Sequence, residues 1–332
     1  MSEIYNEFTF PLRNMESVKL SDEDLNVEQL PQFLRRMKVN QISWKYNAKI
    51  VGVDGSYVET TGDGEKVIVR TPITIMSIPW SFPKIKAEAI KNLAIDLLPC
   101  TEGEGVINPS PWERRMDYLI GPGEFTSQPK RGLKRDILTS DKVLSTGFFN
   151  PIFYFLNPVF IQKSSSFIDF YSSFLSLQLE ESISLISEKP FEVEFQAGKV
   201  KVSDNVIILR TKIWESAKPF RLSWELRNPL ITTDCKPKYN VSLYKFEPAS
   251  IVPLWIEYNQ GNLFLDIANL SDLPVVFTLT IAGRIVKAYA DDEEIKPEFD
   301  RIKVPIKRWG IKEIRIEVKK LIEQFLKRKV NG

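Results

Sequence analysis

A series of short strand-like segments in the second half of the chain restricts its fold more than any other feature. From about Pro158 onward, apolar and β-branched segments follow one another at regular intervals, with turn residues between them. In the segment KEIRIEV, Ile314, Ile316 and Val318 alternate with charged residues. A strand with this period has one face in a core and the other in solvent. We therefore predict an antiparallel β-sandwich in this half.

Two segments of this half carry further expectations. We expect PFRLSWELRN, residues 219–228, to be one of the strands. The closing segment KKLIEQFLKRKVNG has apolar residues at helical spacing, which predicts a short terminal helix. Its basic end, Lys327, Arg328 and Lys329, suits a helix C-terminus because of the helix dipole. The alternative is that this helix is offered to a partner groove or an acidic surface.

The first half is expected to be an α+β region. The tract 49–75 is strand-rich, and SYVETTGDGEKVIVR is typical of a hairpin about Asp63-Gly64. A helix is expected from Pro83 onward, with Ile85, Ala89, Ile90 and Leu93 on one face. The fold class is thus mainly β, with an α+β N-terminal region.

A long segment rich in Gly, Pro, Lys and Arg, residues 121–147, lies between the two halves. Such composition indicates a surface loop that acts as a linker or carries function. We place the domain boundary at its end, which gives an α+β domain over 1–147 and a sandwich domain with its terminal helix over 148–332. A chain of 332 residues is long enough for two such cores.

The complete absence of histidine excludes several classes of function. Catalytic triads, cysteine–histidine pairs and every histidine-containing metal site are ruled out. The net charge of +2 excludes a strongly basic nucleic-acid binder, although a local basic patch remains compatible with it. We expect no resident metal or cofactor.

The two cysteines, Cys100 and Cys235, lie far apart in sequence and in no CxxC pattern. A disulfide is one option, but we interpret them as separate, partly buried thiols of a cytoplasmic protein. The N-terminus lacks the features of a signal peptide, and the apolar run 148–161 is shorter than the ~20 residues that span a membrane. Abundant Lys, Glu and Ile suggest a thermophile.

Four basic residues in the Gly- and Pro-rich segment form the first candidate site. Lys130, Arg131, Lys134 and Arg135 are the densest basic cluster before the C-terminus, and little apolar sequence covers them. Lys and Arg contact acidic partners, including nucleic-acid phosphates. We predict an exposed patch here that binds a partner, with the basic tail as a second contact.

Three carboxylates form the alternative site. KIVGVDGS ends an apolar strand with Asp54, SPWERRMDYL contains Glu113, and LKRDILTS contains Asp136. In this order they resemble the carboxylates of ribonuclease-H-like nucleases, and residues 49–75 resemble the first strand of the NurA nuclease family. The resemblance implies Mg²⁺ or Mn²⁺ held between the carboxylates. That family also uses a histidine, which this chain lacks, so we favour Asp54 as a turn residue before Gly55.

Two tracts of the second half carry a further pattern: residues 157–195, which include NPVFIQK and KPFEVEF, and KPKYNVSLYKFEP, residues 236–248. They resemble an uncharacterised archaeal family, domain of unknown function 432. The resemblance implies a β-rich, archaeal protein and no particular activity.

These observations favour a non-enzymatic binding or scaffold subunit of a larger intracellular assembly. A protein partner is expected, with nucleic acid as a possible contact of the basic loop. Two alternatives stay open: a metal-dependent nuclease that uses Asp54, Glu113 and Asp136, and a carbohydrate-associated β-sandwich module.

Overall fold

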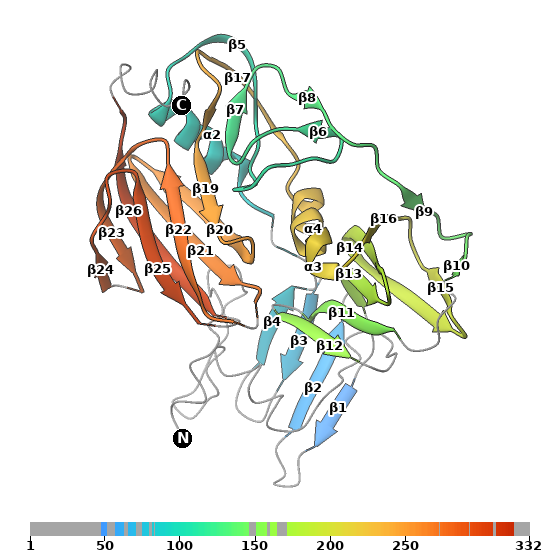
Figure 1. Ribbon diagram of the computed structural model, residues 1–332. Coiled ribbons are helices and arrows are strands. Elements are labelled where there is room, and N and C mark those ends of the chain that lie inside the picture. Colours follow the sequence, from blue (N-terminus) through green and yellow to red (C-terminus); the bar gives the residue numbers. More distant parts are fainter. Residues whose placement is uncertain are drawn as a thin grey trace. The chain divides into compact units, whose positions relative to one another are not determined.

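The part of the chain that the structure describes is mainly β, as predicted. The computed structural model (Figure 1) describes residues 48–51, 57–62, 66–70, 75–79, 82, 84–145, 151–157, 160–164, 171–271, 273–291, 293–307 and 310–321. Two compact units make up the chain, and each consists of two separate segments. Unit 1 comprises Met1–Pro83 and Arg135–Arg227, and unit 2 comprises Lys84–Lys134 and Asn228–Gly332.

This division differs from the predicted boundary after Gly147. The chain passes from one unit to the other between Lys134 and Arg135, inside the Gly- and Pro-rich segment, and it returns after Arg227. The Gly- and Pro-rich composition indicated a linker near the first crossing. The second crossing follows Arg227 at the end of a helix, where the sequence has no Gly- or Pro-rich segment that would indicate a linker.

Unit 1 contains two antiparallel sheets. The first has the order β1-β2-β3-β4. Its strands are β1 (Ala48–Val51), β2 (Tyr57–Gly62), β3 (Lys66–Arg70) and β4 (Ile75–Pro79). The predicted hairpin is confirmed, because β2 pairs antiparallel with β3. Its turn at Asp63-Gly64 lies outside the described residues.

The larger sheet of unit 1 has the order β10-β15-β14-β13-β11-β12. β16 joins it by pairing with β14, and β9 pairs with β16. The strands are β9 (Ile137–Leu138), β10 (Leu144–Ser145), β11 (Ile152–Asn157), β12 (Phe160–Ser164), β13 (Tyr171–Gln178), β14 (Ser182–Gln196), β15 (Lys199–Val202) and β16 (Val206–Thr211). Cross-strand register aligns Phe153 with Leu177, and Leu175 with Leu185. Paired residues share a face, so these side chains form one continuous apolar surface.

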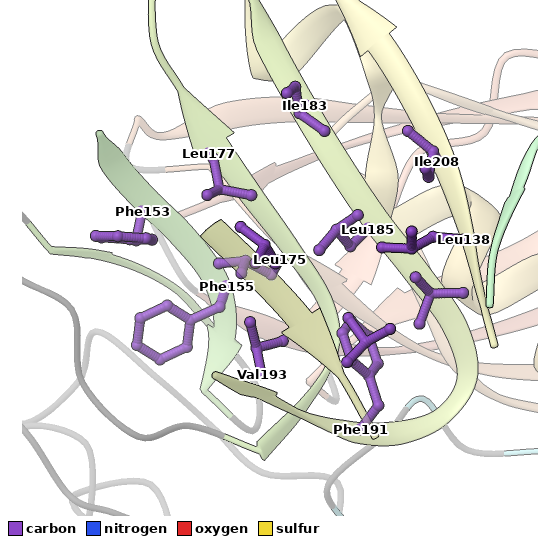
Figure 2. Packing of buried hydrophobic residues seen from close by; sticks show 13 residues of the cluster. Leu138, Phe153, Phe155, Leu175, Leu177, Ile183, Leu185, Phe191, Val193 and Ile208 are labelled. Atoms are coloured by element: carbon purple, nitrogen blue, oxygen red, sulfur yellow. The ribbon is translucent and has the colours of Figure 1, made fainter. Parts of the chain in front are cut away.

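Figure 2 shows the resulting core of unit 1, in which these side chains point toward one another. The buried members are Leu138, Phe153, Phe155, Leu175, Leu177, Ile183, Leu185, Phe191, Val193, Val200, Val202, Val206 and Ile208. The apolar run 148–161 contributes Phe153 and Phe155 to this core.

Unit 1 ends in two short helices, α3 (Trp214–Ala217) and α4 (Pro219–Arg227). The prediction of a strand over 219–228 is therefore wrong. Pro219 opens α4, where its fixed φ suits a first helical turn. The buried residues Phe220, Leu222, Ser223 and Trp224 follow no two-residue period. The alternation of Leu222, Trp224 and Leu226 with polar residues misled the sequence interpretation.

Unit 2 contains a β-sandwich, which confirms the predicted fold class. One sheet has the order β19-β22-β25 and the other β20-β21-β26-β23-β24, and Figure 1 shows them in orange and red. The strands are β19 (Tyr244–Glu247), β20 (Ile251–Asn259), β21 (Asn262–Asn269), β22 (Val275–Ile281), β23 (Arg284–Ala290), β24 (Glu293–Ile295), β25 (Arg301–Ile306) and β26 (Ile311–Lys319). Ile314, Ile316 and Val318 are at most 3% exposed, so their predicted inward position is confirmed.

The remaining elements of unit 2 include one helix and two small sheets. The predicted helix is confirmed as α2 (Ala87–Leu97), which buries Ala89, Ile90 and Leu93. One small sheet has the order β17-β5-β7-β18, and β6 and β8 form a separate two-stranded sheet. These strands are β5 (Cys100–Ile107), β6 (Tyr118–Leu119), β7 (Glu124–Thr126), β8 (Lys130–Arg131), β17 (Ile231–Pro237) and β18 (Val241–Ser242).

The predicted loop over 121–147 therefore contains short strands. Phe125 in β7 is fully buried, and β7 pairs with both β5 and β18. Strands of two or three residues are too short to show a period in the sequence.

The two cysteines form a disulfide, so the expectation of separate thiols is wrong. Antiparallel pairing of β5 with β17 places Cys100 opposite Pro237, two residues from Cys235. The Cα atoms of the cysteines are 5.6 Å apart, which lies within the usual range for a disulfide. Their separation of 135 residues concealed this proximity in the sequence.

Within the described part of the chain, no helix has the length and apolarity needed to cross a membrane. The predicted terminal helix lies outside the described residues from Ile322 onward, and so do its basic residues Lys327, Arg328 and Lys329. Residues 1–47 lie outside them too.

Candidate partner-binding site

The candidate site is built on the β6–β8 lobe, which we define as residues 115–119 and 129–134 of unit 2. Backbone hydrogen bonds join the two segments: the Asp117 N–H donates to the Leu133 carbonyl at 2.8 Å, and the Leu133 N–H donates to the Arg115 carbonyl at 2.7 Å. Met116 and Leu133 thereby form an isolated parallel bridge, and next to it β6 pairs antiparallel with β8. The lobe therefore has a defined backbone, although its strands are only two residues long.

Two residues allow the segments of the lobe to approach closely. A Cβ atom on Gly132 would lie 2.3 Å from the Arg115 carbonyl oxygen and 2.7 Å from the backbone of Tyr118, so only glycine fits there. Asp117 has a φ of 62°, a left-handed conformation that Asp tolerates better than most residues.

Each face of the lobe presents one apolar or aromatic side chain beside a basic one. Tyr118 lies opposite Arg131 in the register, and Leu119 lies opposite Lys130. Residues opposite each other on paired strands share a face. Tyr118 is 46% exposed and Leu119 is 42% exposed, so neither side chain is used for the core of unit 2.

A buried arginine holds the base of the lobe. The Arg114 side chain is 6% exposed. Its Nε donates to Asn108 Oδ1 at 2.7 Å and to Ser110 Oγ at 2.8 Å, and its Nη2 donates to the Asn228 carbonyl. A buried charge is tolerated only when its donors are satisfied, so these acceptors fix Arg114 in place. The backbone of Arg114 also pairs with Ile120, at the end of β6.

Asn108 extends this network to the loop backbone. Its Nδ2 donates to the Trp112 carbonyl at 3.0 Å and to the Gly121 carbonyl at 2.7 Å, while its Oδ1 also accepts from the Ser110 N–H. Asn108 itself is fully buried, and its bond to the Gly121 carbonyl is partly buried. The segment between β5 and β6 is therefore clamped at both ends.

Tyr244 connects this network to the sandwich. Its hydroxyl donates to the Pro109 carbonyl at 2.9 Å. Burial raises the pKa of Tyr244 well above its usual value, and the nearby positive charge of Arg114 opposes that rise only in part. The tyrosine thus stays a neutral hydrogen-bond donor in the folded protein.

An open pocket of about 340 Å³ lies on one face of the lobe. It is lined by Asp117, Tyr118, Pro129, Arg131, Gly132, Leu133 and Lys134. Leu133 is 60% exposed at its rim. The volume lies at the lower end of the range of about 300–1,000 Å³ that ligand pockets occupy.

The lining of the pocket is both charged and apolar. Arg131 and Lys134 supply positive charge, Asp117 supplies one carboxylate, and Tyr118 and Leu133 supply exposed apolar surface. Arg can form two parallel hydrogen bonds to a carboxylate, whereas Lys acts as a point charge. The arrangement suits a ligand that joins an anionic group to an apolar one.

The structure brings three of the predicted basic residues to this lobe. Lys130, Arg131 and Lys134 are exposed, and the last two line the pocket. Arg135 is exposed too, but it begins the second segment of unit 1. The tail residues Lys327, Arg328 and Lys329 lie outside the described residues.

Two of the three candidate carboxylates belong to the described residues, and they fall in different units. Asp54 lies outside the described residues, in the stretch between β1 and β2. Glu113 belongs to unit 2 and forms an ion pair with Arg115 at 2.5 Å, while Asp136 is an exposed residue of unit 1. Within the described ranges, no group of three or more acidic or cysteine side chains could hold a metal ion.

Sequence reasoning missed the apolar half of the site. Leu133 lies in the segment that the composition assigned to a polar loop, and Tyr118 lies just before it. Their exposure depends on a pairing between segments ten or more positions apart. Gly132 was the only local sign of a close approach between two backbone segments, and many glycines in loops have no such role.

Neither a scan of protein-family models nor a search of curated proteins finds a match to this chain. The function is therefore inferred from the geometry of the site.

Proposed function

We propose that the protein is a non-enzymatic binding or scaffold subunit of a larger assembly and that it holds an acidic partner at the β6–β8 lobe. The observation that carries the proposal is the open pocket of about 340 Å³ in which exposed basic and apolar side chains meet. Tyr and Arg are over-represented among residues that dominate binding energy at protein interfaces.

The rigid base of the lobe supports this proposal. Arg114, Asn108 and Tyr244 fix the backbone on which the exposed side chains stand. A surface that is ordered before binding loses less conformational freedom when the partner arrives. Exposed apolar side chains on an ordered lobe are therefore better explained by a partner than by folding.

The low aromatic content of the pocket favours a protein partner over a nucleic acid. Proteins that bind single-stranded nucleic acid combine a basic groove with several stacking aromatic residues. The pocket offers one aromatic ring, that of Tyr118, and its other apolar residues, Leu133 and Pro129, are not stacking platforms.

The alternatives receive less support. A nuclease needs converging carboxylates, and Glu113 is already paired with Arg115. A carbohydrate module would offer free aromatic faces, but on the five-stranded sheet Lys86 lies 4.7 Å from the Trp255 ring centre and Arg315 lies 4.8 Å from that of Tyr289. One face of each ring is thus covered by a cation.

A cytoplasmic location in a thermophilic archaeon remains part of the proposal. Disulfides are rare in the cytoplasm of mesophiles, whereas intracellular proteins of hyperthermophiles are often rich in them. The Cys100–Cys235 disulfide agrees with a cytoplasmic protein only if the source is such an organism.

The test compares the protein with a variant in which Lys130, Arg131, Lys134 and Arg135 are replaced by Ser. Labelled oligoglutamate is the probe, and its affinity is measured from about 50 to about 300 mM salt, because screening weakens exposed charge pairs over this range. A control variant replaces four exposed lysines elsewhere in unit 2, namely Lys84, Lys236, Lys287 and Lys319, and so changes the net charge equally.

We expect the lobe variant to bind about tenfold more weakly and with less salt dependence, while the control keeps most of its affinity. Equal affinities for the parent and the lobe variant would contradict the proposal. Tighter binding of single-stranded oligothymidine than of oligoglutamate would change the partner class to nucleic acid.

A further inference from the structure

We infer that the pocket of the β6–β8 lobe recognises an acidic residue next to an apolar side chain in a partner polypeptide. This inference rests on the proposed function and deepens it, because it specifies what the partner must contain. It is carried by the positions of the charged and apolar side chains in one pocket.

The charges of the pocket orient the ligand. Arg131 and Lys134 attract a carboxylate, and Asp117 repels it. Oxygen atoms of the ligand are therefore drawn to the basic side, where the Arg131 guanidinium can bind both oxygens of one carboxylate.

The apolar residues provide the second contact. Leu133 is 60% exposed and Tyr118 is 46% exposed, and both line the pocket together with Pro129. An apolar side chain of the partner that covers them removes apolar surface of both molecules from water, which is favourable. Tyr118 lies opposite Arg131 on the paired strand, so the two contacts are adjacent.

The form of the pocket favours a polypeptide over a free small molecule. Sites for small molecules bury most of the ligand surface, commonly about 70–90% of it. Here the residues that line the pocket are themselves exposed, so a small ligand would keep much of its surface in water. A side chain presented by a partner chain needs no such enclosure, since the rest of the interface adds contacts.

The experiment uses two peptides of equal length and charge. In one, acidic residues alternate with Phe and Leu, and the other is oligoglutamate with Ser in the alternate positions. The full-length protein is compared with Leu133→Ser, which removes apolar surface from the pocket and leaves every charge in place. The matched control is Leu119→Ser, an equally conservative change on the opposite face of the lobe.

We expect the acidic–apolar peptide to bind about tenfold more tightly than the acidic–serine peptide. Leu133→Ser should remove most of this difference, and Leu119→Ser should preserve it. Tyr118→Ser serves as a second variant, and it should act like Leu133→Ser.

The outcomes separate this inference from the proposed function. Equal affinity for the two peptides, with loss of both in the fourfold basic variant, would overturn the inference and leave the proposed function standing. No binding of either peptide would overturn both. A peptide preference that survives Leu133→Ser and Tyr118→Ser would also overturn the inference, because the apolar contact would then lie elsewhere.

Discussion

At the scale of single residues, the buried network around Arg114 decides where the exposed residues stand. Neighbouring arginines have opposite roles: Arg114 is 6% exposed and bonded to Asn108, whereas Arg115 is exposed and paired with Glu113. No local pattern in the sequence distinguishes the two. The basic cluster, in contrast, could be predicted, because charge density in a Gly- and Pro-rich segment is itself a sign of exposure.

Asn108→Ala tests the importance of this network. The change removes acceptors from Arg114 and Ser110 and a donor from the carbonyls of Trp112 and Gly121. Leaving a buried polar group without its partner costs about 1–3 kcal/mol, so we expect unit 2 to lose about 2–4 kcal/mol of stability. Chemical denaturation followed by fluorescence measures the loss. The exposed Asn240 gives the control, and an Asn108→Ala variant as stable as Asn240→Ala would contradict the account.

Tyr244 gives a prediction on pH. Burial raises its pKa above the ordinary value of 10.0, so the unfolded chain loses this proton at lower pH than the folded protein does. The stability that the neutral tyrosine contributes is therefore complete below about pH 10 and is lost as the pH rises further. Tyr258, whose pKa burial raises to about 12, contributes in the same direction.

We therefore expect Tyr244→Phe to be less stable than the parent at neutral pH, because the bond to the Pro109 carbonyl is lost. The difference in melting temperature between the parent and Tyr244→Phe should shrink as the pH rises from about 9 to about 11. The reason is that only the parent has the Tyr244 hydroxyl, which ionises when the protein unfolds and so destabilises the folded state at high pH. Melting curves at several pH values measure it. A constant difference across this range would show that Tyr244 does not titrate as the structure implies.

At the scale of elements, the sequence predicts strands well where one face is in solvent. The alternation in β25 matches its burial residue by residue, and in β26 the alternating Ile314, Ile316 and Val318 are buried. The alternation of apolar and polar residues did not predict α4 correctly, because its short apolar pattern fits a strand or a helix. It did not predict β7 and β8 either, because these strands are too short to show a period. In these elements, contacts with segments that are distant in sequence determine the secondary structure, and a local sequence pattern does not reveal those contacts.

The disulfide between β5 and β17 gives a prediction at this scale. It joins the two segments of unit 2 across the inserted segment 135–227. In the chain-entropy account, a closed loop of about 100 residues contributes up to about 4.7 kcal/mol, although measured values are often smaller. We expect reduction to lower the melting temperature of the parent.

The double variant Cys100→Ser, Cys235→Ser provides the control for reduction. It should melt at the temperature of the reduced parent and should not respond to the reductant. A parent protein whose melting temperature is the same with and without reductant would contradict a stabilising role for this bond.

At the scale of the whole molecule, each unit is assembled from two segments of the chain. Unit 2 places a lobe from its first segment on a base that its second segment completes, because Arg114 bonds to Asn228 and Tyr244 bonds to Pro109. Amino-acid composition can indicate the position of one linker, but it does not reveal that a unit is built from two segments separated by an insertion. This is why the β-sandwich could be predicted and the base of the site could not.

The claim that the β6–β8 lobe binds an acidic polypeptide is tested most directly by hydrogen–deuterium exchange of the full-length protein with and without the acidic–apolar peptide. The amides of Asp117, Gly132 and Leu133 already donate to backbone carbonyls, so their exchange is slow enough to follow. The account predicts that the peptide slows exchange in residues 115–119 and 129–134 and leaves β22 and β25 unchanged. Protection confined to another part of the chain, or an unchanged lobe under saturating peptide, would contradict it.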